Sequence, residues 1–151
     1  MNNEILYHFF DDDDFLRISN KIQKTEKITS GEIRISIKES KTLRQRNKDV
    51  RKLAEEEFFN LNMNNTRDKT GILIFIILKE RQFLILADSG INEKVSQQTW
   101  DEVRNEMQNR FKEGFYTEGI IFGIERVGQI LSEHFPIKSD DTNELSNRVV
   151  V

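Results

Sequence analysis

The sequence contains no cysteine and only two histidines, His8 and His134. The absence of cysteine excludes disulfide bonds, thiolate metal sites and a cysteine nucleophile. It also fits a reducing compartment, so we expect a cytoplasmic protein. With two imidazoles and no thiolates, zinc and copper would find poor ligands. A metal bound by this chain should therefore be a hard cation held by oxygen atoms.

Long apolar runs are also missing. The longest one, 72–78, is far below the roughly 20 residues that a membrane span needs. The apolar patch at 5–10 is too short for the core of a signal peptide and has no Lys or Arg before it. The formal net charge of −3 provides no positive field for nucleic acid. We therefore expect neither a membrane nor a nucleic acid as partner, and a monomer.

A single proline and seven glycines among 151 residues favour long regular elements in one domain. Alternating isoleucines predict a half-buried strand at 32–39, and a continuous β-branched run predicts a strand covered on both faces at 71–78. A short turn then leads into a partner strand at 82–87. Together with helices, these strands predict a single α/β domain over 1–136, followed by a polar tail at 137–151.

The helices follow from apolar residues at helical spacing. The first follows the four aspartates at 11–14, with Asp14 as its cap, and ends near Gly31 as its C-terminal cap. The others are expected around 50–61, 100–111 and 120–131, and Pro136 stops the last one. Glycines at 119, 123 and 128 in that last helix are expected to permit close packing.

Three acidic residues should meet at one edge of the sheet. A strand–helix–strand unit places 32–39 and 71–78 parallel, and the tight turn makes 82–87 antiparallel to the second strand. The starts of the first two strands and the end of the third then share an edge. Glu32, Asp68 and Asp88 should all lie there.

Carboxylates gathered in this way suit Ca²⁺ or Mg²⁺, and Ca²⁺ takes about 6–8 oxygen ligands. We predict a metal site formed by Glu32, Asp68, Asp88 and Glu93, with carbonyl groups near Gly90. The alternative is structural: Asp88 caps the turn, Glu93 favours the following helix through its dipole, and the other two acids are solvated. An Asp-x-Asp phosphatase nucleophile in the tract at 11–14 is a weaker interpretation than helix capping.

Five segments stand out together: TSGEIRI at 29–35, TGILIFIILKERQFLILADSGINEKV at 70–95, Trp100, FKEGFYTEGIIFGIERVGQILSEHFP at 111–136 and NELSN at 143–147. In this order and spacing they resemble the TPM-domain family. That family includes a thylakoid lumen protein tied to photosystem II repair and many bacterial proteins. The likeness is strongest to a compact, soluble bacterial branch.

The resemblance implies a three-layer α/β/α domain with a twisted mixed sheet of about four strands and helices on both faces. The fourth strand would be short, formed by the tail or by the segment before the first helix. The resemblance also implies Ca²⁺ or other divalent-cation binding in loops at one sheet edge, and an acid phosphatase activity is associated with the plant branch. The matching positions are Glu32, Asp88, Gly90 and Glu93, with Asp68 matched approximately. Asn92 stands where close relatives often have histidine.

Three functions stay open at the level of sequence. The first is a divalent-cation-binding protein, and the second is a metal-dependent acid phosphatase. The third is an interaction module that binds a protein partner by a strand edge or by its tail, which ends in three valines.

Overall fold

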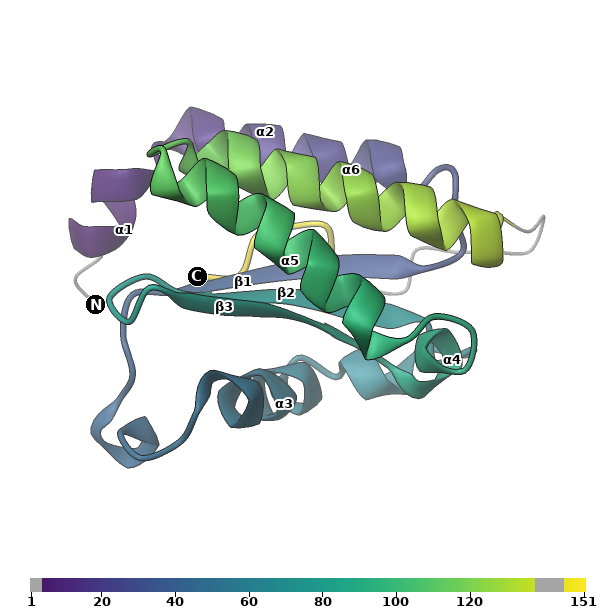
Figure 1. Cartoon of the computed structure of the whole chain (residues 1–151), viewed down its shortest axis with the longest axis horizontal. Helices are drawn as coiled ribbons and strands as arrows, with labels where there is room; N and C mark the ends of the chain where they lie inside the picture. Colours follow the sequence, from purple (N-terminus) through teal and green to yellow (C-terminus); the bar gives the residue numbers. More distant parts are fainter. Residues whose placement is uncertain (1–3, 138–145) are drawn as a thin grey trace.

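The computed structural model describes residues 4–137 and 146–151. A mixed sheet in the order β1-β2-β3 lies between two layers of helices (Figure 1). The strands are β1 (Glu32–Lys38), β2 (Gly71–Ile77) and β3 (Gln82–Ala87). Above the sheet in Figure 1 lie α2 (Asp12–Thr25), α5 (Gln97–Lys112) and α6 (Tyr116–His134), and below it lies α3 (Val50–Asn60). The predicted α/β fold is confirmed.

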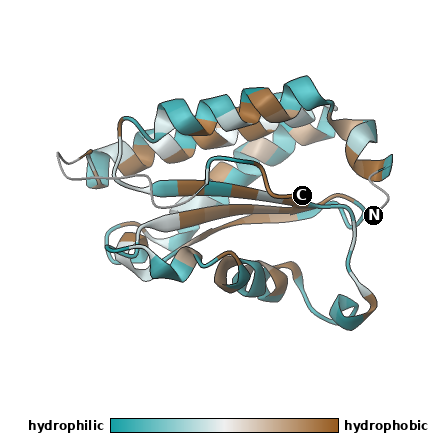
Figure 2. Ribbon diagram, turned by 180° about the vertical axis from the view of Figure 1, so that it is seen from behind, coloured by the Kyte–Doolittle hydropathy of each residue, from teal (hydrophilic) through white to brown (hydrophobic). Residues whose placement is uncertain are grey.

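The predicted strand directions are correct. β1 is parallel to β2 with Glu32 opposite Gly71, and β3 is antiparallel to β2 with Ala87 opposite Ile72. Alternate side chains of β2 enter different cores. Ile72, Ile74 and Ile76 face α2, α5 and α6, whereas Leu73, Phe75 and Ile77 face α3. In Figure 2, β2 is accordingly hydrophobic along most of its length, whereas β1 alternates between hydrophobic and hydrophilic residues.

The prediction of about four strands is wrong, because the described chain contains three. In place of a fourth strand, the chain end pairs with the outer side of β1 through a single parallel bridge between Val150 and Ser36. The Ile37 amide donates to the Val150 carbonyl at 2.7 Å, and the Val150 amide donates to Ile35 at 2.8 Å. The predicted tail, 137–151, falls partly on 138–145, outside the described residues.

The N-terminal region differs from prediction in three details. A short helix, α1 (Glu4–Phe9), precedes α2. The N-cap of α2 is Asp11, not Asp14; Asp14 is the third helical residue, and the two carboxylates form a reciprocal capping box. Gly31 does not cap the helix, which ends at Thr25. A β-carbon at Gly31 would approach Leu131 Cδ1 to 2.8 Å, so this glycine allows α6 to pack closely.

The glycines of α6 permit close helix packing, as predicted. β-carbons at Gly119, Gly123 and Gly128 would overlap with Phe111, Met107 and Thr25. The first two contacts are with α5 and the third is with α2, so α6 lies between these two helices and holds them to each other. None of the helices in the described ranges is both long and apolar enough to cross a membrane.

The outer edge of β3 is covered by side chains of the following helices. The carbonyl oxygens of Phe83, Ile85 and Ala87 point away from β2. They accept hydrogen bonds from Arg104 Nε at 2.8 Å, Gln97 Nε2 at 2.8 Å and Asn92 Nδ2 at 2.9 Å, respectively. This arrangement saturates acceptors that another strand would otherwise use.

Candidate functional site

Glu32 and Asp88 lie on either side of the start of β2. The amide of Glu32 donates to the Thr70 carbonyl, and the amide of Asp88 donates to the Gly71 carbonyl, both at 2.9 Å. Two acids that are 56 positions apart in the sequence are therefore anchored to the first residue of β2 and to the residue directly before it. The predicted meeting of these acids at one sheet edge is confirmed for their backbones.

Asp88 uses only part of its carboxylate as a cap. It is the N-cap of α4 (Ser89–Asn92), where its Oδ1 accepts from the Ser89 amide at 2.7 Å. Its second oxygen, Oδ2, is buried and has no hydrogen-bond partner among the described residues. A buried charged oxygen without a partner costs free energy unless a donor or a cation reaches it. Capping alone therefore does not account for this side chain.

Asp68 belongs to the loop that precedes β2, and it is exposed. Arg67 donates to its Oδ2 from Nε at 3.1 Å and from Nη2 at 2.9 Å. Gly90 packs directly against this loop, because a β-carbon there would overlap with the Asp68 carbonyl oxygen and lie 2.5 Å from that of Lys69. The loop carrying Asp68 and the helix capped by Asp88 are thus in contact.

Glu32 is buried, with 4% of its surface exposed. The residue that sequence reasoning missed lies next to it: Glu26, which follows the last residue of α2. Glu26 Oε2 accepts from the Ile33 amide at 2.8 Å, and its Oε1 is buried without a hydrogen-bond partner in the described ranges. The pKa of Glu26 is raised to about 8: burial is the main cause, the hydrogen bond from the Ile33 amide opposes the rise, and the charge of Glu32 adds a smaller increase.

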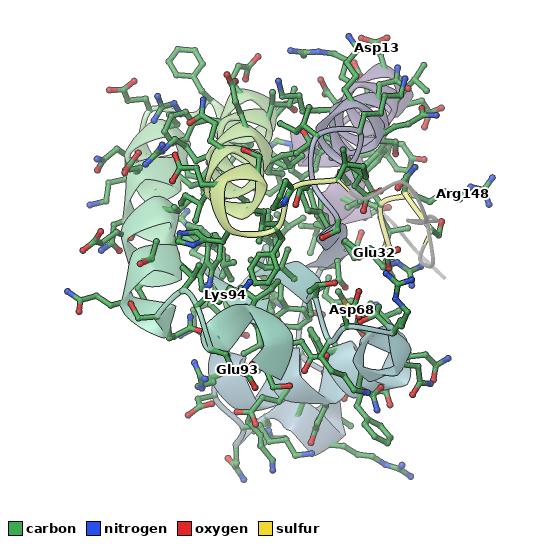
Figure 3. All side chains as sticks on the ribbon, turned by 90° about the vertical axis from the view of Figure 1, so that its right-hand side faces the viewer. Asp13, Glu32, Asp68, Glu93, Lys94 and Arg148 are labelled. Carbon is green, nitrogen blue, oxygen red and sulfur yellow. The ribbon has the colours of Figure 1, made fainter. Side chains whose placement is uncertain are left out.

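Glu93 occupies a different position from the other predicted ligands. It is the C-cap residue of α4 and is exposed. Viewed from the end of the molecule, Glu32 and Asp68 lie on one side of this surface, and Glu93 lies apart from them along α4 (Figure 3). Among residues 4–137 and 146–151, no three or more His, Cys, Asp or Glu side chains are grouped to hold a metal ion. The assignment of all four acids as ligands stays a prediction.

The arrangement provides two acidic residues with backbones fixed by β2, a third in the loop against α4, and an additional buried acid behind Glu32. Asp88 contacts the backbone amide of Ser89 rather than its hydroxyl, so it does not activate that hydroxyl as a nucleophile. Carboxylate oxygens of this kind are the ligands that hard cations prefer. The signal that would have found Glu26 is its position directly after α2, because the short connection 26–31 returns the chain from the end of that helix to the start of β1.

These features define an α/β protein with a mixed sheet between helical layers and an acidic end formed by strand starts and a short capped helix. The family model described as the TPM domain matches residues 6–130. The chain belongs to the TPM-domain family. A comparison with curated proteins finds no match.

Solved structures share this fold. The chain is similar to the BA42 protein of the psychrophilic bacterium Bizionia argentinensis, with 37% identity, a TM-score of 0.84 and coverage of 94% of both chains. It is also similar in fold to the N-terminal domain of a protein from P. gingivalis, with 15% identity, a TM-score of 0.68 and coverage of 84% of this chain and 79% of that one. For the N-terminal domain of the cg2496 protein from Corynebacterium glutamicum, the identity is 11%, the TM-score is 0.61, and the coverages are 81% and 74%.

Proposed function

We propose that this TPM-domain protein binds a hard divalent cation, with Ca²⁺ as the preferred ion and Mg²⁺ as the alternative. The ion would be held where β1 and β2 begin and β3 ends, by oxygen atoms of Asp88, Glu32 and Asp68 and by water. The observation that carries the proposal is the buried Oδ2 of Asp88, which lacks a hydrogen-bond partner among the described residues beside an acidic strand start. A cation would supply the missing interaction.

Glu93 contributes to the proposed site in a different way from the other three acids. Because it is exposed and lies apart from them, it would add negative charge along the path of an approaching cation, not a coordinating oxygen. The Glu93→Gln variant would then weaken binding slightly, and it would do so less at high salt, where charges this far apart are screened.

Binding without turnover is the form of the proposal that the site supports. A metal-dependent phosphatase would need a nucleophile or a base that activates water next to the ion. Ser89 does not fill that role, because the carboxylate of Asp88 bonds to its amide. An assay with p-nitrophenyl phosphate and Ca²⁺ or Mg²⁺ tests the alternative: hydrolysis that Asp88→Asn abolishes would establish it.

An interaction module is the third function. Strand addition would have to displace existing partners, because Val150 pairs with β1 at Ile35 and Ile37, and side chains of Arg104, Gln97 and Asn92 bond the outer carbonyls of β3. The outer sides of both edge strands, β1 and β3, are therefore already hydrogen-bonded, which favours a cation over a peptide strand as the ligand.

Thermal or urea unfolding with and without Ca²⁺ tests the proposal. At 100 times its dissociation constant, the ion should add about 2.7 kcal/mol to the free energy of unfolding. Asp88→Asn is the informative variant, because asparagine still caps α4 but removes the negative charge. Asp13→Asn, on the exposed first turn of α2, is the matched control. Stabilisation should survive in Asp13→Asn and be lost in Asp88→Asn; equal stabilisation of both variants, or none in the wild type, would reject the proposal.

A further inference from the structure

A cavity of about 400 Å³ lies at the opposite end of the sheet from Glu32 and Asp88, where β2 ends and β3 begins. Its walls come from the end of α1, the β2–β3 hairpin, the last turns of α5 and the first turn of α6. A volume of this size falls within the range of about 300–1,000 Å³ that is typical of small-molecule sites.

Aromatic rings form much of the wall, and they hold one another in place. Phe9 packs edge-to-face on Tyr116 with 4.7 Å between ring centroids, and Phe83 packs on Phe111 at 4.9 Å. Phe111 and Tyr116 join the two pairs at 5.8 Å. Because these rings come from α1, β3, α5 and α6, the apolar wall is built before any ligand arrives. It offers flat surfaces on which an aromatic ligand can pack.

The charged side chains that line the cavity are both cationic, Arg81 of the hairpin and Lys112 near the end of α5. Neither forms an ion pair within the described part of the chain. Arg81 is held in the left-handed conformation at φ 52°, and its amide donates to the Leu78 carbonyl at 3.1 Å. The backbone from which the guanidinium extends is therefore fixed by the turn.

A second cavity of about 420 Å³ lies between β1 and α3, and its cations differ from those of the aromatic cavity in their ion pairing. There Lys38 Nζ lies 3.1 Å from Glu57 and Lys48 Nζ lies 2.6 Å from Glu56, so the cations that line or adjoin that cavity already have acidic partners. At the aromatic cavity the positive charges have no such partners among residues 4–137 and 146–151, and a ligand would supply the negative charge.

We propose that the aromatic cavity binds a small amphipathic organic anion, with a ring system packed on Phe9, Phe111 and Tyr116 and a carboxylate or sulfonate bonded to Arg81 and Lys112. This site is separate from the proposed cation site and does not depend on it. The rings provide apolar burial, and the two cations orient the acid group toward the hairpin.

Fluorescence titration with anilinonaphthalene sulfonate tests the proposal, because this probe carries an aromatic body and a sulfonate. The double variant Arg81→Asn, Lys112→Gln removes both charges, and asparagine tolerates the left-handed conformation at the turn. Lys79→Gln, which removes a charge from the same hairpin outside the cavity, is the matched control. We expect the double variant to bind the probe about fivefold more weakly and the control to bind it like the wild type.

Two further measurements keep the test independent of how well the double variant folds. With the wild type alone, uncharged phenylnaphthylamine should bind more weakly than the sulfonate. Probe-induced amide shifts should fall at 81–83 and 108–116. Absence of binding by the wild type, equal affinity of the double variant, equal affinity for the uncharged probe, or shifts located elsewhere would each overturn the proposal.

Discussion

Gly90 lies against the backbone of Asp68 so closely that a β-carbon on the glycine would overlap with the Asp68 carbonyl oxygen. This contact joins the loop before β2 to the helix that Asp88 caps. The acidic end of the molecule is therefore assembled through backbone atoms, which cannot rotate away as a side chain could.

The first prediction follows from this contact. Gly90→Ala should lower the free energy of unfolding by about 2–3 kcal/mol, because its methyl group has only backbone to displace. Gly114 is the matched control, since its φ is +85° but nothing lies within 4 Å of the β-carbon position. Gly114→Ala should cost only about 1 kcal/mol, from conformational strain alone. Urea unfolding measures both; equal losses would mean that the Gly90 contact is not tight.

The second prediction concerns pH. The folded protein retains the Glu26 proton up to about pH 8, whereas the unfolded chain loses it near the ordinary value of 4.5. The stability associated with the raised pKa is thus fully present below pH 4.5 and is lost as the pH rises toward 8. Between pH 5 and pH 7.5, Glu26 alone should lower the free energy of unfolding by about 3 kcal/mol.

The Glu26→Gln variant has no carboxyl group to titrate at this position. Its free energy of unfolding should therefore fall by about 3 kcal/mol less than that of the wild type between pH 5 and pH 7.5. Unfolding is measured in the presence of a chelator, so that no divalent cation contributes. The matched control is Glu102→Gln, which changes an exposed acid on α5. The free energy of unfolding of this control should fall with pH as steeply as that of the wild type. If the Glu26→Gln variant loses stability with pH as steeply as the wild type, Glu26 does not carry the raised pKa.

The third prediction tests the role of the aspartate tract. Asp11→Ala removes the acceptor for the Asp14 amide, which lies 2.8 Å from Asp11 Oδ1, and should cost about 1 kcal/mol. Asp13→Ala, at an exposed position of the same tract, should cost less than about 0.5 kcal/mol. Thermal unfolding of the two variants measures the difference. Equal losses of unfolding free energy in the two variants would show that Asp11 does not stabilise α2 as its N-cap.

The fourth prediction concerns the chain end. Truncation after Asn147 removes the two backbone hydrogen bonds between Val150 and β1 and should lower the free energy of unfolding by about 2 kcal/mol, with cooperative unfolding retained. Val150→Ala keeps both backbone bonds and is the comparison. A truncated protein as stable as the wild type would show that this pairing contributes nothing.

The sequence predicts the sheet well because its signals are local. Alternating isoleucines mark β1, a continuous apolar run marks β2, and a turn too short to cross over fixes the direction of β3. Strand geometry alone then predicts that Glu32 and Asp88 share an edge. The close packing at the glycines of α6 is also predictable, because a glycine within an apolar helix leaves room for a neighbouring helix; Gly119 and Gly123 face α5, and Gly128 faces α2.

What sequence reasoning misses depends on contacts between distant segments. The six residues of α1 are too few to show a helical period, and burial of Leu6 fixes them in place. The chain end is one of two candidates for an additional short strand, but the sequence does not predict the residue that pairs with β1: Val150 forms a bridge to Ser36, a contact between distant segments. Glu26 looks like an ordinary residue after a helix, and only the return of the chain to β1 buries it beside Glu32.

The most direct test of the cation site is an NMR titration of the wild type with Ca²⁺ that follows backbone amide shifts. We predict saturable shifts concentrated at 30–33, 66–70 and 88–93, with residues around the aromatic cavity unaffected. Asp88→Asn should abolish the saturable component at the same calcium concentrations. Shifts that remain absent at millimolar Ca²⁺, or that fall outside these three segments, would contradict the account.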